Sequence, residues 1–342
     1  MPELPEVETV KVGLGKLLPG KKIASVQYDW DKSFPNNKHD VDGFLVGSKV
    51  QKVRRRAKVL MIDLSTEYSL VIHLKMTGQL VFVGDERFGA GHPTDSLIGS
   101  LPDKSTRIIF CLSASKGDEF EINARKQRSA QGNVQEVRRT STGVDDMAVT
   151  QKRWQSFGLC PEPGQCDAHL YFNDQRKFGW VRLIPTVEIP NIDFFKKVGP
   201  EPLGDDFKFG DFKKQLEKRK NSMIKAALLD QTVVAGIGNI YADESLYMAK
   251  IHPSTRVKDV SETKLKSLYE AIREVLNLSI EKGGSSDRNY VDAEGKRGSY
   301  LGFAKVFRRE GKPCERCGSE IIKIKVAGRG THICPKCQKE PK

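Results

Sequence analysis

The first eight residues of the chain, Met1-Pro2-Glu3-Leu4-Pro5-Glu6-Val7-Glu8, combine a potential nucleophile with potential acids. Removal of the initiator methionine, which is usual before proline, would leave Pro2 with a secondary α-amine. An α-amino group titrates near ~8 and a lysine near ~10.4, so the terminal amine is far more often uncharged at neutral pH. An uncharged amine can form a Schiff base, with Glu3 beside it as general acid. The alternative is purely structural: proline and acidic residues in the first turn of a helix.

Four cysteines near the end of the chain form two CxxC pairs, Cys314 with Cys317 and Cys334 with Cys337. Each pair can bind one ion from a tight turn, and together they complete a tetrahedron. Four thiolates leave no open coordination position, so we predict one structural zinc ion; a redox dithiol is the alternative. Because the chain has 7 cysteines, an odd number, and four of them pair in this way, we expect no disulfide framework.

Two glycine-containing segments could approach a phosphate closely. Residues 236–241, Gly-Ile-Gly-Asn-Ile-Tyr, precede a predicted helix with Asn239 as its N-cap, and such a terminus either binds an anion or simply caps the helix. Lys220 and Lys225 lie upstream and favour the phosphate interpretation. Arg329 lies between two glycines at the tip of a predicted hairpin, where a guanidinium can bind a phosphate bidentately; an ordinary turn is the alternative.

Residues 54–58, Arg-Arg-Arg-Ala-Lys, interrupt a strand pattern. Strand alternation would place Arg54, Arg56 and Lys58 on one face. Such a row of cations could bind phosphates or could be a solvated strand face.

Two further turns carry side chains that are unusual at such positions. Met76 lies in the turn at 73–78, and Arg176, Lys177 and Phe178 lie in the turn at 173–179. Exposed Met, Arg and Phe side chains suit wedges that fill the space left by an extruded base. Either turn alone would be interpreted as structural.

The composition indicates a globular protein with a polyanionic partner. The chain has 342 residues, a net charge of +13 and a pI near 9.3, which favours nucleic acid. The first twenty residues contain three glutamates and no apolar segment, so we expect no signal peptide. Without an apolar run of ~20 residues, we expect no membrane association and a cytoplasmic location.

The periodicity changes along the chain in a way that predicts three domains. A helix over about 7–18 is followed by short strands at 23–26, 49–53, 59–64, 69–74, 80–83, 107–110, 169–172 and 180–183. Residues 185–202 are predicted to be a linker, and helices follow at 209–216, 223–229 and 240–248. The longest helix begins after Ser261 and ends at Gly283. Residues 113–167 are polar and far longer than a normal turn, so we predict an insertion, largely disordered and dispensable for catalysis.

With these motifs in place, the chain resembles the formamidopyrimidine-DNA glycosylases, a family of bacterial 8-oxoguanine glycosylases with AP-lyase activity. The resemblance covers residues 1–112 and 168–340. It implies a multidomain α+β protein. Residues 1–195 would form an N-terminal helix and antiparallel β-sandwich, residues 196–290 a helix-two-turn-helix domain, and residues 291–342 a lesion-capping loop and a β-hairpin zinc finger. The partner would be double-stranded DNA with oxidised bases, bound in the interdomain cleft by a monomer.

The resemblance also implies individual roles. Pro2 would attack C1′ of the damaged nucleotide, Glu3 would protonate the sugar or the leaving group, and Glu6 would support the site. Lys58 would serve phosphate contact and β-elimination, and Arg329 would bind phosphate and assist δ-elimination. The expected DNA contacts are Met76, Arg176 and Phe178 in the space left by the base, Lys177 beside them, Lys220, Asn239 and Tyr241 on phosphates, and the loop at 285–300 over the flipped base.

The chain departs from the family pattern in one turn, and two other functions stay open. Gln175 and Lys177 stand where the family commonly has Pro and Arg, which loosens the turn and removes a bidentate fork.

An endonuclease VIII-like glycosylase for oxidised pyrimidines is the first alternative function, and Leu4 argues against it because that branch typically begins Pro-Glu-Gly-Pro. A non-catalytic DNA-binding paralogue is the second, and it would be expected to lose Pro2 or Glu3.

Overall fold

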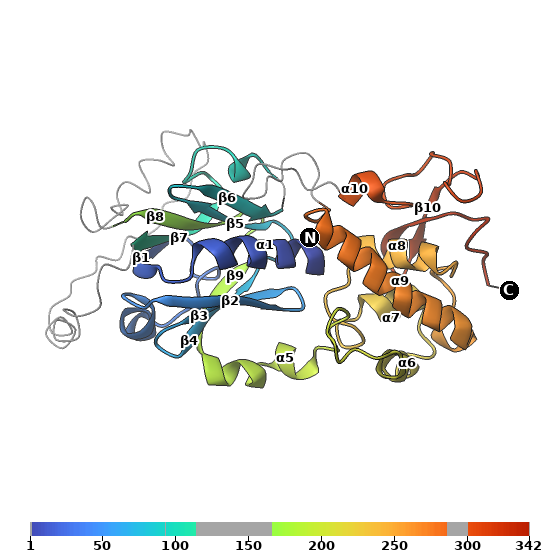
Figure 1. The fold of residues 1–342 in the computed structure, drawn as a ribbon, viewed down its shortest axis with the longest axis horizontal. Helices are drawn as coiled ribbons and strands as arrows, with labels where there is room; N and C mark the ends of the chain where they lie inside the picture. Colours follow the sequence, from blue (N-terminus) through green and yellow to red (C-terminus); the bar gives the residue numbers. More distant parts are fainter. Residues whose placement is uncertain (1, 93, 114–165, 286–299, 342) are drawn as a thin grey trace, which may run out of the picture.

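The computed structural model describes residues 2–92, 94–113, 166–285 and 300–341. Its two large parts lie side by side: a β-sandwich, and a group of helices with a β-hairpin behind it (Figure 1). The N-terminal helix runs along the sandwich with its first residues at the junction between the two parts. This mixed α+β architecture confirms the fold predicted from the sequence.

The sandwich consists of two antiparallel sheets. The five-stranded sheet has the order β1-β7-β8-β5-β6, and the four-stranded sheet has the order β2-β3-β4-β9. The strands span β1 Lys22–Tyr28, β2 Val50–Arg56, β3 Val59–Leu64, β4 Tyr68–His73, β5 Gly78–Val83, β6 Arg87–Gly91, β7 Thr106–Ser113, β8 Ala168–Asp174 and β9 Trp180–Pro185. Helix α1, Leu4–Leu17, packs its Val7, Val10 and Leu14 into the core between the sheets.

Strand β6 is the one strand of the described sandwich that the sequence did not predict. Its sequence, Arg-Phe-Gly-Ala-Gly, has too few β-branched residues to signal a strand. Phe88 nevertheless fills a space that α1 leaves open at Gly13, where a Cβ atom would lie 2.1 Å from the Phe88 ring. Tertiary packing therefore decides this strand.

The ends of the predicted insertion are paired with each other. Strands β7 and β8 are neighbours, with Leu112 opposite Ala168, as expected for strands that a short turn could join. The insertion itself lies outside the described residues, apart from its ends. At those ends Cys111 forms a disulfide with Cys166, with their Cα atoms 5.5 Å apart. From the sequence we expected no disulfide framework and did not foresee this bridge, because it links positions 55 residues apart, a spacing that carries no sequence signal.

The linker contains regular structure. A 3₁₀ turn at Thr186–Asn191 and helix α5, Asp193–Lys197, follow β9. Ile189, with Phe194 and Phe195 beside it, packs on Val59, Met61 and Val71 of the four-stranded sheet. The linker is therefore fixed against the sandwich by an apolar cluster.

The helical part matches the predicted helices closely. Ser261 caps the longest helix by accepting a hydrogen bond from the amide of Lys264 at 3.4 Å. The elements of this part span α6 Phe209–Glu217, α7 Ile224–Leu229, α8 Asn239–Met248, α9 Glu262–Glu281, α10 Tyr300–Phe303, β10 Ile322–Val326 and β11 Arg329–Ile333, with a 3₁₀ turn at Val257–Asp259. The sandwich also carries α2 Lys38–Asp40, a π-helix at Val41–Leu45 and a 3₁₀ turn at Asp95–Leu97. No helix among the described residues is long and apolar enough to cross a membrane.

Candidate active site

The beginning of α1 is built around its own acidic residues. Glu3 is the N-cap, and its backbone amide donates to Glu6 Oε2 at 2.7 Å in a capping box. Pro2 is buried immediately before it. The acidic residues therefore do have the structural role in the first helical turn that was considered as an alternative. The same capping contacts hold the candidate nucleophile and the candidate acid at one end of the helix.

The environment of Glu3 favours the protonated form of its carboxyl group. Its side chain is 3% exposed. Oε1 accepts from the amide of Ile240 at 3.1 Å, whereas Oε2 has no hydrogen-bond partner among the described residues. Burial raises the pKa of Glu3 to about 7, partly offset by the charge of Lys58 and reinforced by Glu6. A carboxyl group with this pKa and one unsatisfied oxygen can donate a proton at physiological pH.

The glycines at 236 and 238 make room for the start of the chain. A Cβ atom on Gly238 would lie 2.3–2.7 Å from the carboxyl atoms of Glu3. At Gly236, where φ is +82°, a Cβ atom would lie 2.6 Å from Leu4, whose amide donates to the Gly236 carbonyl at 3.0 Å. The observed reason for this glycine pattern is therefore close approach to Glu3 and Leu4. Gly238, not Asn239, is the N-cap of α8, which corrects the predicted cap by one position.

Replacing Gly238 with alanine should displace the Glu3 carboxyl group and lower base excision, the activity that the sequence predicts, by about 10²-fold, the usual cost of misplacing a reacting group by about 1 Å. Single-turnover excision measures this effect. The matched control is Gly210→Ala in α6, where a Cβ atom meets nothing within 4 Å. Equal excision rates in the two variants would show that Gly238 has no such role.

Glu6 connects the N-terminal domain to the helical domain. Its Oε1 accepts from the hydroxyl of Tyr241 at 2.5 Å and from the amide of Ser285 at 2.7 Å. Tyr241 is 0% exposed, and its hydroxyl also lies 2.6 Å from Ser279 Oγ. The structure thus corrects the assignment of Tyr241 as a phosphate contact, because both its ring and its hydroxyl are enclosed in the core. Burial raises the pKa of Tyr241, so the phenol stays protonated and can donate to Glu6.

Lys58 reaches the same junction from the sandwich. Ala57, with φ +53°, and Lys58 form the turn between β2 and β3, so Lys58 leaves the strand alternation assumed from the sequence. Lys58 is 6% exposed, and its Nζ donates to the carbonyl of Ile237 at 2.8 Å. Burial lowers the pKa of Lys58, and the nearby charges of Glu3 and Glu6 oppose that shift. A lysine whose pKa is lowered releases its proton more readily, which suits a group that exchanges protons with the site.

The neighbouring arginines are used structurally. Arg55 lies 2.7 Å from Glu8 and 2.9 Å from Glu201, and Arg54 lies 2.8 Å from Asp63. Of the row predicted on one strand face, Arg54 lies against Asp63, Arg56 lies 3.0 Å from Glu201 Oε1 and Lys58 is buried, so the row does not form the open phosphate clamp considered from the sequence.

Arg329 is exposed at the first position of β11, and a buried network fixes the hairpin beneath it. Lys225 Nζ donates to Asp243 Oδ1 at 2.6 Å and to Thr331 Oγ1 at 2.7 Å. Asn239 Nδ2 donates to the carbonyl of Gly330 at 3.0 Å. The hairpin tip thus lies against the start of α8, one residue after the glycine that contacts Glu3.

This network revises two assignments from the sequence. Lys225 is 0% exposed and paired with Asp243, so it does not offer its charge to a phosphate in this structure. Asp243 was missed altogether, because nothing in the sequence pairs it with Lys225, 18 positions earlier. Glu244, also missed, accepts from the amides of Lys305, Val306 and Phe307 at 2.7–2.9 Å and anchors the segment that enters the zinc finger.

The four cysteine sulfurs are arranged as a zinc site requires. Sγ of Cys317 lies 3.4 Å from that of Cys334, and Sγ of Cys314 lies 4.0 Å from that of Cys337; all four lie within 4.8 Å of one another. Zn–S bonds of ~2.3 Å in a tetrahedron place sulfurs about 3.8 Å apart. The donor set therefore fits one structural zinc ion, as predicted.

Replacing Cys334 with serine should remove the zinc and weaken DNA binding together, because apparent zinc binding of roughly 10–16 kcal/mol is coupled to folding of such a finger. Metal content and duplex affinity are measured on the same preparation. Pro335→Ala changes the same turn without removing a ligand and should keep both properties. Full DNA affinity in a zinc-free protein would contradict this coupling.

The turns at 73–78 and 173–179, which carry the predicted wedge residues, lie against each other. The buried carboxylate of Asp174 accepts from the amides of Phe178 at 2.7 Å and Gly179 at 2.6 Å, and from the hydroxyl of Thr77 in the other turn. Met76 and Phe178 are 39% and 52% exposed, so two large apolar side chains stand at the surface together.

Arg176 lies between these two side chains. Its guanidinium is 4.9 Å from the Phe178 ring centre, and its Nη1 is 3.1 Å from Met76 Sδ. Asp174, which the sequence pattern did not single out, holds the turn that lacks the family's proline at Gln175.

The remaining predicted contacts lie at the surface. Lys177, with φ +58°, points its Nζ at the Trp30 ring, 4.8 Å from the centre. Lys220 is exposed just after α6. The loop expected to cover the flipped base lies outside the described residues, except for its ends.

The β-sandwich and the helical domain meet at a buried acid, Glu3, which lies beside Pro2, and a zinc-finger hairpin lies against the helical domain. This combination defines a class of DNA-repair enzyme. Comparisons with known proteins agree. Family models match at residues 1–130 (formamidopyrimidine-DNA glycosylase N-terminal domain), 198–290 (formamidopyrimidine-DNA glycosylase H2TH domain) and 311–339 (zinc finger found in FPG and IleRS). The chain belongs to the formamidopyrimidine-DNA glycosylase family.

Individual relatives align from end to end. The formamidopyrimidine-DNA glycosylase of Pelotomaculum thermopropionicum is 35% identical over 340 residues, covering 99% of each chain. That of Streptococcus pyogenes serotype M6 is 36% identical over 343 residues, again covering 99% of each. Among solved structures, a Lactococcus lactis Fpg mutant bound to Fapy-dG-containing DNA has a TM-score of 0.75 at 31% identity, with 99% of this chain and 100% of that chain covered.

Proposed function

We propose that this protein is a bifunctional DNA glycosylase and AP lyase that removes oxidised purines, 8-oxoguanine and formamidopyrimidines, from double-stranded DNA in base excision repair. The observation that carries the proposal is the Glu3 carboxyl group, buried beside Pro2 with one unsatisfied oxygen among the described residues and a pKa of about 7. We place the enzyme on DNA in the bacterial cytoplasm, acting as a monomer.

In the proposed reaction the amine of Pro2 attacks C1′ and the bond from C1′ to the base breaks. Glu3 supplies the proton that the sugar or the departing base takes up. The C1′–O4′ bond then breaks, O4′ takes up a proton and the sugar ring opens, which leaves an iminium between Pro2 and C1′, the Schiff base. Loss of a 2′ proton and of the 3′ phosphate completes β-elimination, and we assign the exchange of that proton to Lys58, whose Nζ donates to the carbonyl of Ile237. Loss of the 5′ phosphate by δ-elimination follows, assisted by Arg329.

We assign the DNA contacts to predicted residues whose side chains are exposed. Met76, Arg176 and Phe178 would enter the space left by the extruded base, with Arg176 facing the opposite cytosine, while Lys177 and Lys220 would contact the backbone. Asn239 Nδ2 donates one of its two hydrogens to the Gly330 carbonyl at 3.0 Å, which leaves the second for a phosphate oxygen. We therefore assign Asn239 to holding the Arg329 hairpin as well as to phosphate contact.

The substrate class is tested by comparing duplexes that contain 8-oxoguanine with duplexes that contain thymine glycol. We expect faster excision of 8-oxoguanine. The reverse preference would favour an endonuclease VIII-like enzyme. Tight binding without excision of either lesion would favour the non-catalytic paralogue, which the presence of Pro2 and Glu3 argues against.

A further inference from the structure

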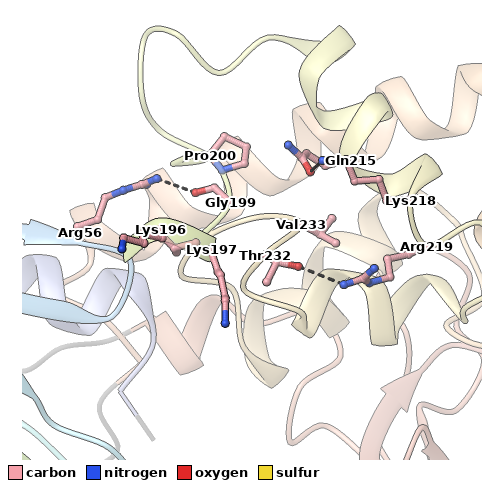
Figure 2. A pocket seen from close by; sticks show the side chains of 11 residues that line it. Arg56, Lys196, Lys197, Gly199, Pro200, Gln215, Lys218, Arg219, Thr232 and Val233 are labelled. Atoms are coloured by element: carbon pink, nitrogen blue, oxygen red, sulfur yellow. Dashed lines mark hydrogen bonds between the residues drawn. The ribbon is translucent and has the colours of Figure 1, made fainter. Parts of the chain in front are cut away.

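A cavity of about 330 Å³ lies beside the linker, where the sandwich meets the helical domain (Figure 2). Its walls come from the end of β2, from residues 196–200 of the linker, from the end of α6 and from residues 232–233. None of the residues to which we assign a catalytic role lines it. It is therefore a separate feature of the domain junction.

The lining of this cavity is strongly basic. Five of its side chains are cationic, and no acidic side chain is among the described residues that line it; the five are Arg56, Lys196, Lys197, Lys218 and Arg219. Arg56 and the two linker lysines come from the sandwich side, whereas Lys218 and Arg219 come from the helical domain (Figure 2). The positive charge is thus contributed from both sides of the junction.

The two guanidinium groups are held in place by neighbours at the rim. Arg56 Nη2 donates to the carbonyl of Gly199 at 2.7 Å, and its Nη1 lies 3.0 Å from Glu201 Oε1 without hydrogen-bond geometry. Arg219 Nε donates to Asp230 Oδ2 at 2.9 Å. Because these contacts fix the side chains beforehand, less conformational entropy is lost when a ligand binds.

The three lysines have no acidic partner in the part of the chain that the structure describes. Lys196, Lys197 and Lys218 are all exposed, and Lys218 donates only to Gln215 Oε1 at 2.9 Å. Like charges gathered around one cavity repel one another, and an anion placed among them relieves that repulsion.

We propose that this cavity binds a phosphate group and that the bound phosphate bridges the two domains across the linker. Planar guanidinium groups and lysine ammonium groups together form the usual protein environment for phosphate oxygens. Phosphate chemistry has two sources for such a protein: a backbone phosphate of the duplex outside the lesion site, or a free phosphorylated molecule. The assignment is independent of the catalytic roles given to Pro2, Glu3, Lys58 and Arg329.

The test uses the full-length protein with Lys196, Lys197 and Lys218 replaced by glutamine. The control replaces three exposed lysines elsewhere, Lys38, Lys104 and Lys266, by glutamine, which changes the net charge equally. Isothermal titration with inorganic phosphate measures the free-anion arm. The DNA arm compares a duplex that extends only a few base pairs beyond an abasic-site analogue with a much longer one, over a range of salt concentrations.

If the duplex is the source, the pocket variant binds the long duplex more weakly than wild type does and the short duplex equally well. The slope of its affinity against salt concentration then becomes shallower by about 0.9 for each backbone phosphate that the variant no longer neutralises. If a free molecule is the source, wild-type protein binds inorganic phosphate and the variant binds it about tenfold more weakly, with both duplexes unaffected. The proposal is overturned if wild type, variant and control behave alike in both arms, or if the control is weakened as much as the variant.

Discussion

Replacing Glu3 by glutamine should lower base excision by about 10²–10⁴-fold, the usual contribution of a general acid, while leaving lesion binding intact. Glutamine keeps the size of the side chain and an oxygen that can accept from Ile240, but it has no acidic proton to give. Single-turnover excision and duplex affinity measured on the same variant separate the two effects. Glu8→Gln is the control, because Glu8 lies on the same helix and pairs with Arg55 and Lys11 instead of facing the site.

The same substitution should change stability in a pH-dependent way. The folded-state pKa of Glu3, about 7, lies above its ordinary value of 4.5, so between these values the folded protein holds a proton that the unfolded chain has lost. The free energy of unfolding of the wild type therefore falls as pH rises from 4.5 to 7, by roughly 3 kcal/mol from this group. Glu3→Gln cannot ionise, so it should be the more stable protein at pH 8 and should lose that advantage toward pH 4.5.

For Glu8 we expect the opposite dependence of stability on pH. Although partial burial acts to raise it, hydrogen bonds from Arg55 and Lys11 lower the pKa of Glu8 below its usual range. Its stabilisation is present above the ordinary pKa and is lost as pH falls through the lowered one, so Glu8→Gln should be destabilising at neutral pH. Chemical unfolding of both variants at pH 5 and pH 8 checks the pair. A Glu3→Gln protein that excises normally, or that is less stable than wild type at pH 8, would remove Glu3 from its assigned role.

Much of the architecture could be predicted because the periodicity of the sequence is strong. The long helix after Ser261 shows an uninterrupted apolar face and a capping residue, and it forms as expected. The CxxC pairs likewise predict the zinc site, since their chemistry depends on local spacing. The wedge turns come together because the strands that carry them, β5 and β8, are neighbours in one sheet.

What the sequence could not show is how distant segments meet. The pattern at 236–238 suggested a phosphate site, yet its glycines are required by side chains more than two hundred positions earlier. Lys225 and Tyr241 suggested DNA contacts, and both are buried because Asp243 and Glu6 reach them from other elements. Basic and aromatic residue types are shared by binding surfaces and buried networks, so only tertiary contacts distinguish the two.

The most direct measurement is reductive trapping of the covalent intermediate. With borohydride present, the protein that begins at Pro2 should become cross-linked to a duplex containing 8-oxoguanine or an abasic site, and mass spectrometry of the digested adduct should place the DNA on Pro2. In a preparation that retains Met1, the Pro2 nitrogen is part of a peptide bond and cannot act as an amine. This form should lose essentially all cross-linking, while its zinc content and its duplex affinity persist. Undiminished cross-linking by the Met1-retaining form, or an adduct on Lys58, would contradict the assignment of the N-terminal amine as the nucleophile.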